Sequence, residues 1–486
     1  MPNNKDRVCI IGAGPAGLSS AMYLEKKGYT DYVIYEKLNK VGGKCWSPKL
    51  KVKHNGKEEE KTFETGAIMG AITYHAVSEM EEFGGYYHVG PDWKEGEPNM
   101  RREFRSLDGE VEHPFEPKVN FSFKKLFGLL KLKKQMKRLN KLMQTKYVGY
   151  DCYGHIGVAK GEYYGISKGV DGYCGATKEN SFPNYIKGVN PNLKDLALPF
   201  AEFCKLNKVE EVQRIWIAPF TSFGYGYFDE IPAALVMKYL DVTTALEFVN
   251  MKLWTWAEGT QQIYVHVNEK LKHPALLETE VVKVERPKGK KIRVTIRHDG
   301  KETVEEFDKL IVTTPLDYFI NYADADETEK ELFSKIIHER YIDYVATFEE
   351  GKSPNISGYM VDNMVPERLG HAMVYYNRWQ HLDRDCPATV YALGNHTGSK
   401  DVDYDTVQKT MDEDMKRVGF PIKEKHFAQE VYYCPHVSAK DYADGWYDRL
   451  EALQGNKNTF YAGEIISFGD MEDTCAASKD IVGRFF

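Results

Sequence analysis

The feature that most constrains the fold is a glycine-rich turn near the start of the chain. The apolar run from Val8 to Ile11 leads into this turn, and helical periodicity follows from Leu18 to Lys27. A second apolar run, Val33 to Tyr35, ends at Glu36. This order of strand, turn, helix and strand predicts a βαβ unit with two parallel strands.

The turn also has the spacing of a dinucleotide-binding site. Its glycines permit a tight turn, close approach of a pyrophosphate to the backbone, and close packing of the helix on the strand. The helix start favours negative charge, and an acid about twenty residues further on binds a ribose hydroxyl. The sequence therefore predicts a Rossmann-type site. Its predicted residues are Gly12, Gly14, Pro15, Ala16, Gly17, Glu36 and Lys37.

Two distant segments are expected to complete the same domain. Runs at Leu277 to Val284, Ile292 to Arg297 and Thr303 to Phe307 predict a β-meander, and Leu310 to Thr313 predicts a strand that returns parallel to the first. Near the end of the chain, a strand and turn are expected at 459–464 and a terminal helix at 475–486.

We therefore expect an α/β fold, α+β overall, with three domains. The dinucleotide-binding domain is discontinuous and covers 5–72, 251–317 and 456–486. A mixed substrate-binding domain covers 73–114 and 318–455, and a mostly helical cap covers 115–250. Within the cap, about 150–192 is interpreted as a loop insertion, which is either a lid or specificity element or a passive surface feature.

Charge and cysteine spacing exclude several functional classes. The net charge of −7 and the pI near 6.1 give no general attraction to nucleic acid. The eight cysteines lack metal-binding or redox spacing, so we expect no metal and free thiols in a reducing compartment. The polar start does not suit a signal peptide, and no run approaches the roughly 18 apolar residues of a membrane-spanning helix. We expect a soluble, cytoplasmic protein.

A second glycine pair indicates which dinucleotide is bound. Val41-Gly42-Gly43-Lys44 and the terminal Tyr461-Ala462-Gly463-Glu464 resemble the two FAD contacts of amine-oxidase-like flavoproteins. The resemblance implies an amine-oxidase-like architecture and non-covalent FAD. It also implies that a helix following Gly463 points its positive end at the pyrimidine ring, where it would stabilise the anionic reduced flavin.

The same resemblance assigns further contacts. Val281 would hold the adenine through its backbone, and the segment from Gly66 to Met69 would lie along the isoalloxazine with Met471. Cys434 lies in the region where some monoamine oxidases carry a cysteine bonded to the flavin, and the alternative is an inert buried thiol. The implied FAD contacts are Gly43, Lys44, Gly66, Ala67, Ile68, Met69, Val281, Gly463, Glu464 and Met471.

Longer motifs run almost from end to end of the chain. They are Gly66-Ala67-Ile68-Met69-Gly70, Arg101-Arg102-Glu103-Phe104, Phe220-Thr221-Ser222-Phe223-Gly224-Tyr225-Gly226, Leu253-Trp254-Thr255-Trp256, Ile356-Ser357-Gly358-Tyr359, Pro366-Glu367-Arg368-Leu369-Gly370-His371, Pro435-His436-Val437-Ser438 and Asn458-Thr459-Phe460 with the terminal FAD motif. Together they resemble the bacterial FAD-dependent polyunsaturated fatty acid isomerases. The chain departs from that family at about 153–190, where its connection is much longer.

This resemblance implies a reaction without net oxidation. A polyunsaturated fatty acid such as linoleic acid would be converted into a conjugated isomer, with flavin N5 taking a hydride from the bis-allylic carbon and returning it. No catalytic side chain is implied. Arg102 and Phe223 would gate the tunnel mouth, where Arg102 binds the carboxylate of the free fatty acid. Candidates for the tunnel wall, whose spacing also suits plain core, are Trp254, Trp256, Tyr375, Tyr376, Trp379, Tyr432 and Tyr433.

Residues 121–150 form a basic segment with interleaved apolar residues and no acid. Two interpretations fit this segment: it contacts an anionic membrane, where it would collect free fatty acid, or it is the solvated face of a helix packed on the body of the protein.

Two other functions of the protein also stay open. One is an FAD-dependent amine oxidase that releases hydrogen peroxide, and the other is a non-catalytic flavin-binding redox sensor.

Overall fold

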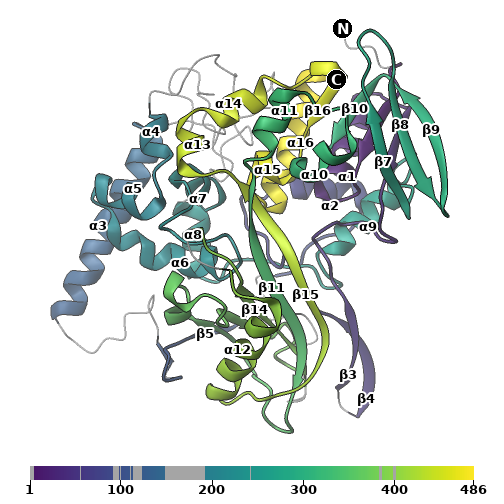
Figure 1. Cartoon of the computed structure of the whole chain (residues 1–486). Coiled ribbons are helices and arrows are strands. Elements are labelled where there is room, and N and C mark those ends of the chain that lie inside the picture. The colour runs from purple at the N-terminus through teal and green to yellow at the C-terminus, as the bar shows by residue number, and fades with distance from the viewer. Residues whose placement is uncertain are drawn as a thin grey trace.

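Figure 1 presents the computed structural model of the chain. The structure describes residues 5–54, 56–90, 98, 100–109, 111–112, 123–147, 192–240, 242–382, 386–397 and 401–486. The predicted insertion lies outside these residues except for Asn192. Its two interpretations therefore remain predictions.

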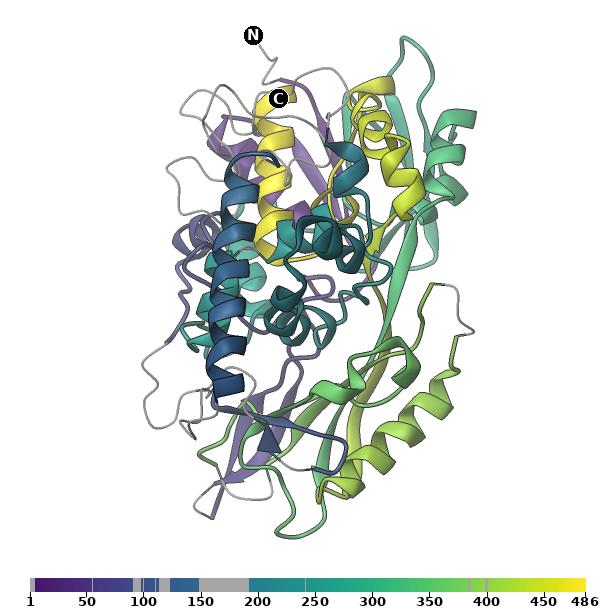
Figure 2. The same ribbon diagram turned by 90° about the vertical axis from the view of Figure 1, so that its left-hand side faces the viewer.

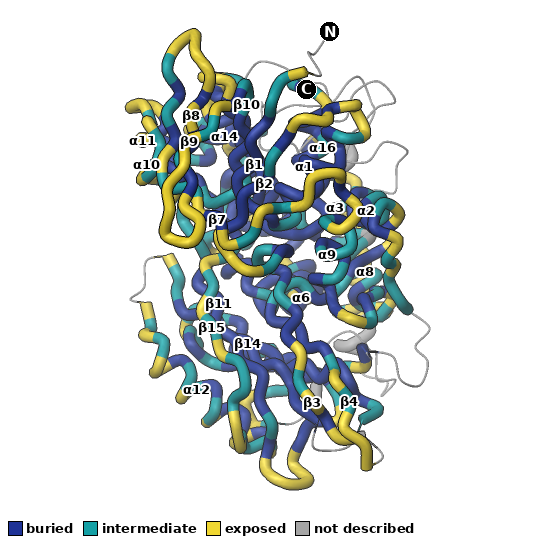
Figure 3. Tube along the Cα trace, turned by 90° about the vertical axis from the view of Figure 1, so that its right-hand side faces the viewer, coloured by how far each residue is buried: buried dark blue, intermediate teal, exposed yellow. Residues whose placement is uncertain are grey.

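The predicted βαβ unit is confirmed and belongs to a four-stranded parallel sheet of order β16-β10-β1-β2. The strands are β1 (Val8–Ile11), β2 (Tyr32–Tyr35), β10 (Lys309–Val312) and β16 (Thr459–Tyr461). Helices α1 (Pro15–Lys26) and α16 (Met471–Phe485) pack against each other and are largely buried (Figure 3). Because the four strands are parallel, the segments that follow them emerge at the same edge of the sheet.

The predicted meander is also confirmed, with shifted ends. Its strands are β7 (Thr279–Glu285), β8 (Ile292–His298) and β9 (Lys301–Phe307), paired in that order and antiparallel. β7 begins at Thr279 rather than at Leu277, and Leu276 before it forms a parallel bridge with Tyr35 at the end of β2. The meander is thereby joined to the end of the βαβ unit.

The mixed block contributes a seven-stranded sheet of order β15-β11-β14-β13-β12-β5-β6. Its strands are β5 (Arg102–Arg105), β6 (Val111–Glu112), β11 (Ile337–Phe348), β12 (Ser357–Met360), β13 (Val374–Tyr376), β14 (Ala388–Leu393) and β15 (Ile422–His436). Helix α12 (Tyr404–Arg417) buries Val407, Met411 and Met415 in a cluster with residues of β11 and β14. The long strands β11 and β15 extend from this sheet toward the parallel sheet (Figure 1).

Every described element between residues 123 and 249 is helical. These elements are α3 (Phe123–Gln144), α4 (Leu193–Leu196), α5 (Phe200–Asn207), η2 (Glu210–Val212), α6 (Gln213–Thr221), α7 (Ala233–Tyr239) and α8 (Val242–Val249). They form a layer beside the two sheets, with α3 running along its outer side (Figure 2).

The remaining elements connect these parts. A two-stranded hairpin, β3 (Lys49–His54) and β4 (Lys57–Thr62), was not predicted. The helices are α2 (Ala76–Gly84), α9 (Gln261–Lys270), α10 (Leu316–Tyr322), α11 (Glu327–Phe333), α13 (Ala439–Ala443), α14 (Trp446–Glu451) and α15 (Glu464–Ser467), with short turns η3 (Val361–Asn363), η4 (Pro366–Arg368) and η5 (Asn456–Asn458). Across the described ranges, no helix has the length and apolar character needed to cross a bilayer.

Candidate active site

The glycine-rich turn packs closely at the edge of the parallel sheet. Gly12 has a φ of +102°, and a Cβ on Gly12 would lie 2.8 Å from Thr313 Oγ1. A Cβ on Gly17 would lie 1.9 Å from the carbonyl oxygen of Gly12, which the close approach of α1 to β1 does not allow. Pro15 occupies the first turn of α1, where its missing N–H is tolerated. These residues therefore leave backbone, rather than side chains, at the start of α1.

The predicted ribose acid lies beside this turn. The buried carboxylate of Glu36 accepts hydrogen bonds from the backbone N–H of Ala13 at 2.9 Å and of Leu38 at 2.8 Å. The two oxygens of a carboxylate together accept about four hydrogen bonds, so these contacts leave it able to accept more. Lys37 is exposed next to it, and Val281 is half-buried on β7.

The second glycine pair comes against the first. The N–H of Gly42 donates to the carbonyl of Ala13 at 2.9 Å, and a Cβ on Gly43 would lie 3.1 Å from the Cα of Gly14. Gly463 reaches the same place, where its Cβ would lie 3.0 Å from the carbonyl oxygen of Thr313. Segments more than 400 residues apart thus form one backbone-lined cradle, which suits a pyrophosphate.

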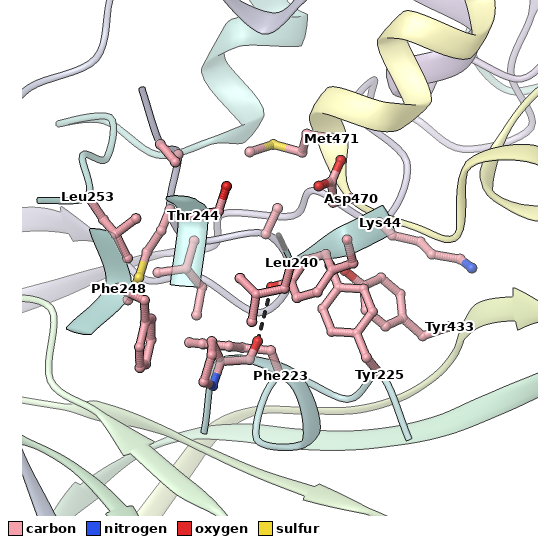
Figure 4. A pocket seen from close by; sticks show the side chains of 18 of the residues that line it. Lys44, Phe223, Tyr225, Leu240, Thr244, Phe248, Leu253, Tyr433, Asp470 and Met471 are labelled. Atoms are coloured by element: carbon pink, nitrogen blue, oxygen red, sulfur yellow. Dashed lines mark hydrogen bonds between the residues drawn. The ribbon is translucent and has the colours of Figure 1, made fainter. Parts of the chain in front are cut away.

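A cavity lies beside this cradle, and its wall includes Lys44, the residue after Gly43. Together with the space that opens to solvent, it measures about 900 Å³. Its wall is mostly apolar and aromatic (Figure 4). The lining residues are Lys44, Thr65, Gly66, Ala67, Ile68, Met69, Gly70, Ala71, Tyr74, Pro219, Phe223, Tyr225, Tyr239, Leu240, Thr244, Phe248, Leu253, Tyr341, Val431, Tyr433, Asp470 and Met471.

Several predicted flavin contacts share this cavity. Gly66 to Met69 and Met471 all line it, as does Lys44. A Cβ on Gly66 would lie 2.1 Å from the carbonyl oxygen of Lys44, so this segment is held directly against the second glycine pair. The ammonium group of Lys44 forms an ion pair with Glu464 and lies 5.6 Å from the ring centroid of Tyr433.

The helix that follows Gly463 differs from the expectation in one respect. α15 is a single short turn, and the longer α16 begins at Met471 rather than near Cys475. Asp470 caps α16 by accepting a hydrogen bond from the N–H of Asp473 at 2.5 Å. Because Asp470 and Met471 line the cavity, the positive end of α16 points into it.

Of the predicted gate residues, Phe223 lies with Phe248 across the cavity from Met471 (Figure 4). Phe223 lines the cavity, and its ring packs edge-to-face on Phe248 with centroids 6.5 Å apart. Arg102 does not line the cavity itself. Its guanidinium lies 4.2 Å from the ring centroid of Phe248 and donates to the carbonyl of Val249 at 3.0 Å. One aromatic ring therefore separates Arg102 from Phe223.

Most of the aromatic candidates for a tunnel wall lie elsewhere. Among them, only Tyr433 lines the cavity. Trp254 stacks on His88 with centroids 3.9 Å apart, and buried Trp256 donates its indole N–H to Glu81 at 2.5 Å. Trp379 is also buried, as are Tyr375 and Tyr376, whereas Tyr432 is half exposed. The wall is built instead by rings that the sequence did not single out, including Tyr74, Tyr239 and Tyr341.

Ionisation inside the cavity is limited. Burial raises the pKa of each of Tyr74, Tyr225 and Tyr239 well above the ordinary value of a tyrosine, so these hydroxyls stay neutral.

Cys434 is buried outside the cavity wall, where its Sγ lies 3.4 Å from the Cβ position of Gly469, and burial also raises the pKa of its thiol. A thiol kept protonated is a poor nucleophile. No cluster of His, Cys, Asp and Glu suited to a metal occurs in the described ranges.

Comparison with known proteins agrees with this geometry. The family model of the flavin containing amine oxidoreductases matches residues 15–319. The crystal structure of a CLA-producing fatty acid isomerase from P. acnes has a TM-score of 0.83 and 40% identity, and covers 100% of both chains. Putrescine oxidase bound to putrescine has a TM-score of 0.64 at 14% identity, over 98% of this chain and 97% of that one, and it shows the fold alone.

A curated relative is more distant. The polyenoic fatty acid isomerase of Ptilota filicina is 24% identical over 318 residues, which are 64% of this chain and 56% of that protein. The chain thus spans little more than half of that relative. The predicted amine-oxidase-like fold with a Rossmann-type domain is confirmed, and the chain is a full-length homologue of a fatty acid isomerase. The chain belongs to the flavin containing amine oxidoreductase family.

Proposed function

We propose that this protein is an FAD-dependent isomerase that converts a polyunsaturated fatty acid, such as linoleic acid, into a conjugated isomer. The observation that carries the proposal is an apolar, aromatic cavity whose wall includes Lys44, the residue after Gly43 of the dinucleotide cradle. Support also comes from the 40% identity, over the full length, to a CLA-producing fatty acid isomerase. A long hydrocarbon chain suits such a wall better than a small polar substrate does.

FAD would be held without a covalent bond. The backbone at Gly14 and Gly43 would receive the pyrophosphate, and Glu36 would accept hydrogen bonds from the ribose. The flavin ring would lie along 66–69 and Met471, with the positive end of α16 beside it. Bound FAD would supply a hydride acceptor that takes hydrogen from the bis-allylic carbon and returns it at one end of the diene.

The residues of the chain would protect the reacting carbons. Loss of a hydride leaves a cation on the substrate, which water or a nucleophile would trap. The wall offers neutral hydroxyls and aromatic faces, and such faces stabilise a nearby cation by roughly 0.5–2 kcal/mol each. Tyr225 and Tyr239 stack with centroids 3.9 Å apart on this wall. No general acid or base among the side chains is required.

The gate would orient the fatty acid. Arg102 would bind the carboxylate at the mouth through charge-assisted hydrogen bonds. Phe223 would close the tunnel behind the bound fatty acid. Phe248 contacts both Arg102 and Phe223 and would couple their movements. Phe223 and Phe248 lie across the cavity from Met471 (Figure 4). The flavin end and the carboxylate end of the substrate would then lie on opposite sides of the cavity.

We also propose that α3 contacts an anionic membrane, from which free fatty acid is collected. Its outer face exposes Phe127 by 69%, Leu130 by 54% and Leu129 by 36%, beside exposed Lys133, Lys134 and Lys137. Apolar side chains flanked by lysines are typical of helices that lie in a membrane interface. The opposite face packs on the body through Leu139 and Met143.

The test is to incubate the yellow, flavin-loaded protein with linoleic acid while following conjugated-diene absorbance and oxygen uptake together. Diene formation without oxygen uptake supports the isomerase. Peroxide formation from amines with a flat diene trace contradicts it and favours an amine oxidase. Inactivity in both assays contradicts the isomerase and favours a non-catalytic flavoprotein.

A further inference from the structure

Asp470 is an acid on the wall of an otherwise apolar cavity. The charged residues that line the cavity are Lys44 and Asp470. The ammonium of Lys44 is paired with Glu464, and its side chain points away from the cavity centre (Figure 4). Asp470 is 7% exposed and lies next to Met471, on the side away from Phe223 and Phe248. Of these two charges, Asp470 is therefore the one that adjoins Met471, beside which the flavin ring is proposed to lie.

The neighbouring acids have other partners. Lys238 forms a buried ion pair with Asp473 at 3.7 Å. The carboxylate of Glu472 accepts hydrogen bonds from the backbone N–H groups of His75, Ala76 and Val77 at 2.6–2.8 Å. Asp470 differs from both, because its carboxylate caps a helix and also borders the cavity. When it is ionised, its negative charge faces the space available to substrate.

We propose that the Asp470 carboxylate stabilises the positive charge that develops on the reacting carbons of the fatty acid. The inference rests on the proposed function. When the bis-allylic C–H bond breaks, both electrons leave with the hydrogen, and the substrate carries one positive charge until the hydride returns. A fixed anion in a water-poor cavity attracts such a charge far more strongly than the same anion would in water. Asp470 would act through its charge and form no covalent bond.

The ionisation of Asp470 sets the pH range of this effect. Burial raises the pKa of Asp470 to about 6, against the opposing effects of the Asp473 and Glu472 N–H groups and the charge of Lys238. The carboxylate is therefore charged above about pH 6 and neutral below it, so the rate should rise through that pH. The groups that interact with Asp470 are Lys238 on α7, Glu472 and Asp473 on α16, the neutral hydroxyls of Tyr74, Tyr225 and Tyr239, and the thiols of Cys434 and Cys475, whose pKa burial raises.

Asp470 also caps α16, so a substitution could act by weakening this helix rather than by removing the charge. Substitutions that keep the cap separate the two effects. Asn and Ser cap helices about as well as Asp. Asp470→Asn and Asp470→Ser therefore remove the charge and keep the cap. Asp403 caps α12 in the same way, by accepting a hydrogen bond from the N–H of Thr406 at 3.0 Å, and does not line the cavity. Asp403→Asn is the matched control.

The direct test measures affinity for a cation rather than turnover. The probe is a fatty acid analogue with a protonated secondary amine in place of the bis-allylic carbon, compared with its neutral ether counterpart. Binding to the flavin-loaded protein at pH 8 is followed by the change in flavin absorbance. We expect wild type and Asp403→Asn to prefer the amine at least about tenfold, and both Asp470 variants to lose that preference.

A second readout is the pH profile of diene formation. We expect a kcat about 10- to 100-fold lower in Asp470→Asn, without the inflection near pH 6, and an unchanged KM. Equal affinity of wild type for amine and ether, or a preference that survives in Asp470→Asn, would overturn the inference. If wild type forms no diene, the proposed function fails, whereas the amine preference still tests the charge of Asp470 separately.

Discussion

Arg102 and Arg101 are adjacent in the chain but have different surroundings. The guanidinium of Arg102 stacks on Phe248 at the cavity, whereas exposed Arg101 donates to Gln380 at 3.2 Å. We predict that Arg102→Ala raises KM for linoleate about 10- to 100-fold, because a charge-assisted contact to the carboxylate is lost. Steady-state kinetics measure this effect.

Two comparisons sharpen this prediction. Arg101→Ala should leave KM within about twofold. With the methyl ester of linoleic acid, which has no carboxylate charge, wild type and Arg102→Ala should have similar KM. An equal loss with acid and ester would show that Arg102 supports the fold and does not bind the carboxylate.

Gly14 tests the cradle without disturbing the fold. Its φ is −80°, and an added Cβ would lie 3.6 Å from the Cα of Gly43, which is an ordinary contact. Gly14→Ala should therefore fold, but the methyl group should obstruct the pyrophosphate. We predict a Kd for FAD at least tenfold higher, a loss of about 1.4 kcal/mol or more. Titration of the apoprotein with FAD measures it.

Glycine replacement elsewhere provides the controls. Gly128→Ala in α3 meets no atom within 4 Å, so FAD affinity should not change. Gly17→Ala would place a Cβ 1.9 Å from the Gly12 carbonyl oxygen, so the fold itself should be destabilised. Unchanged FAD affinity in Gly14→Ala would move the pyrophosphate away from this turn.

At the scale of elements, Glu472 joins α16 to α2. Its buried carboxylate accepts the three N–H groups at the start of α2. Glu472→Ala leaves these donors without their acceptor, and we predict a loss of about 2–4 kcal/mol in the free energy of unfolding. The measurement is thermal or denaturant unfolding of the flavin-loaded protein.

The matched control is an acid on α2 itself. Glu79 is 30% exposed and pairs with Lys26 and Lys479. Because partly exposed ion pairs contribute little, Glu79→Ala should lower the free energy of unfolding by no more than about 1 kcal/mol. Equal losses in the two variants would contradict the role given to Glu472.

The α3 helix makes a separate prediction. Reversal of Lys133, Lys134 and Lys137 to Glu should reduce cosedimentation with anionic phosphatidylglycerol vesicles at least about tenfold, since each basic residue contributes about 1 kcal/mol. Reversal of exposed Lys288, Lys290 and Lys301 on the meander is the control. Sedimentation that the α3 reversal leaves unchanged, or wild type that stays in the supernatant, would contradict the membrane contact.

On the scale of the whole molecule, the dinucleotide half was predictable because its signals are local. Strand, turn and helix follow one another around Gly12, and β10 and β16 have their own apolar runs. The strands of the seven-stranded sheet were not located, because pairing between segments as distant as β5 and β12 leaves no local signal.

The cavity wall was harder to predict for the same reason. Tyr74, Tyr239 and Tyr341 come from separate elements that only tertiary packing brings together. Trp256 was a candidate for the wall because it is large and aromatic, but its indole N–H needs a buried partner and finds Glu81. Asp470 was missed because the terminal helix was expected to begin at Cys475, whereas α16 begins at Met471, directly after Asp470. Its place beside Met471 was the available signal.

Hydride transfer from the bis-allylic carbon is tested most directly with linoleic acid deuterated at that carbon. We predict a conjugated isomer that keeps both deuterium atoms, one of them moved along the hydrocarbon chain, with no oxygen consumed. Loss of one deuterium to water would contradict the hydride path. Oxygen uptake with peroxide and no conjugated product would contradict the isomerase itself.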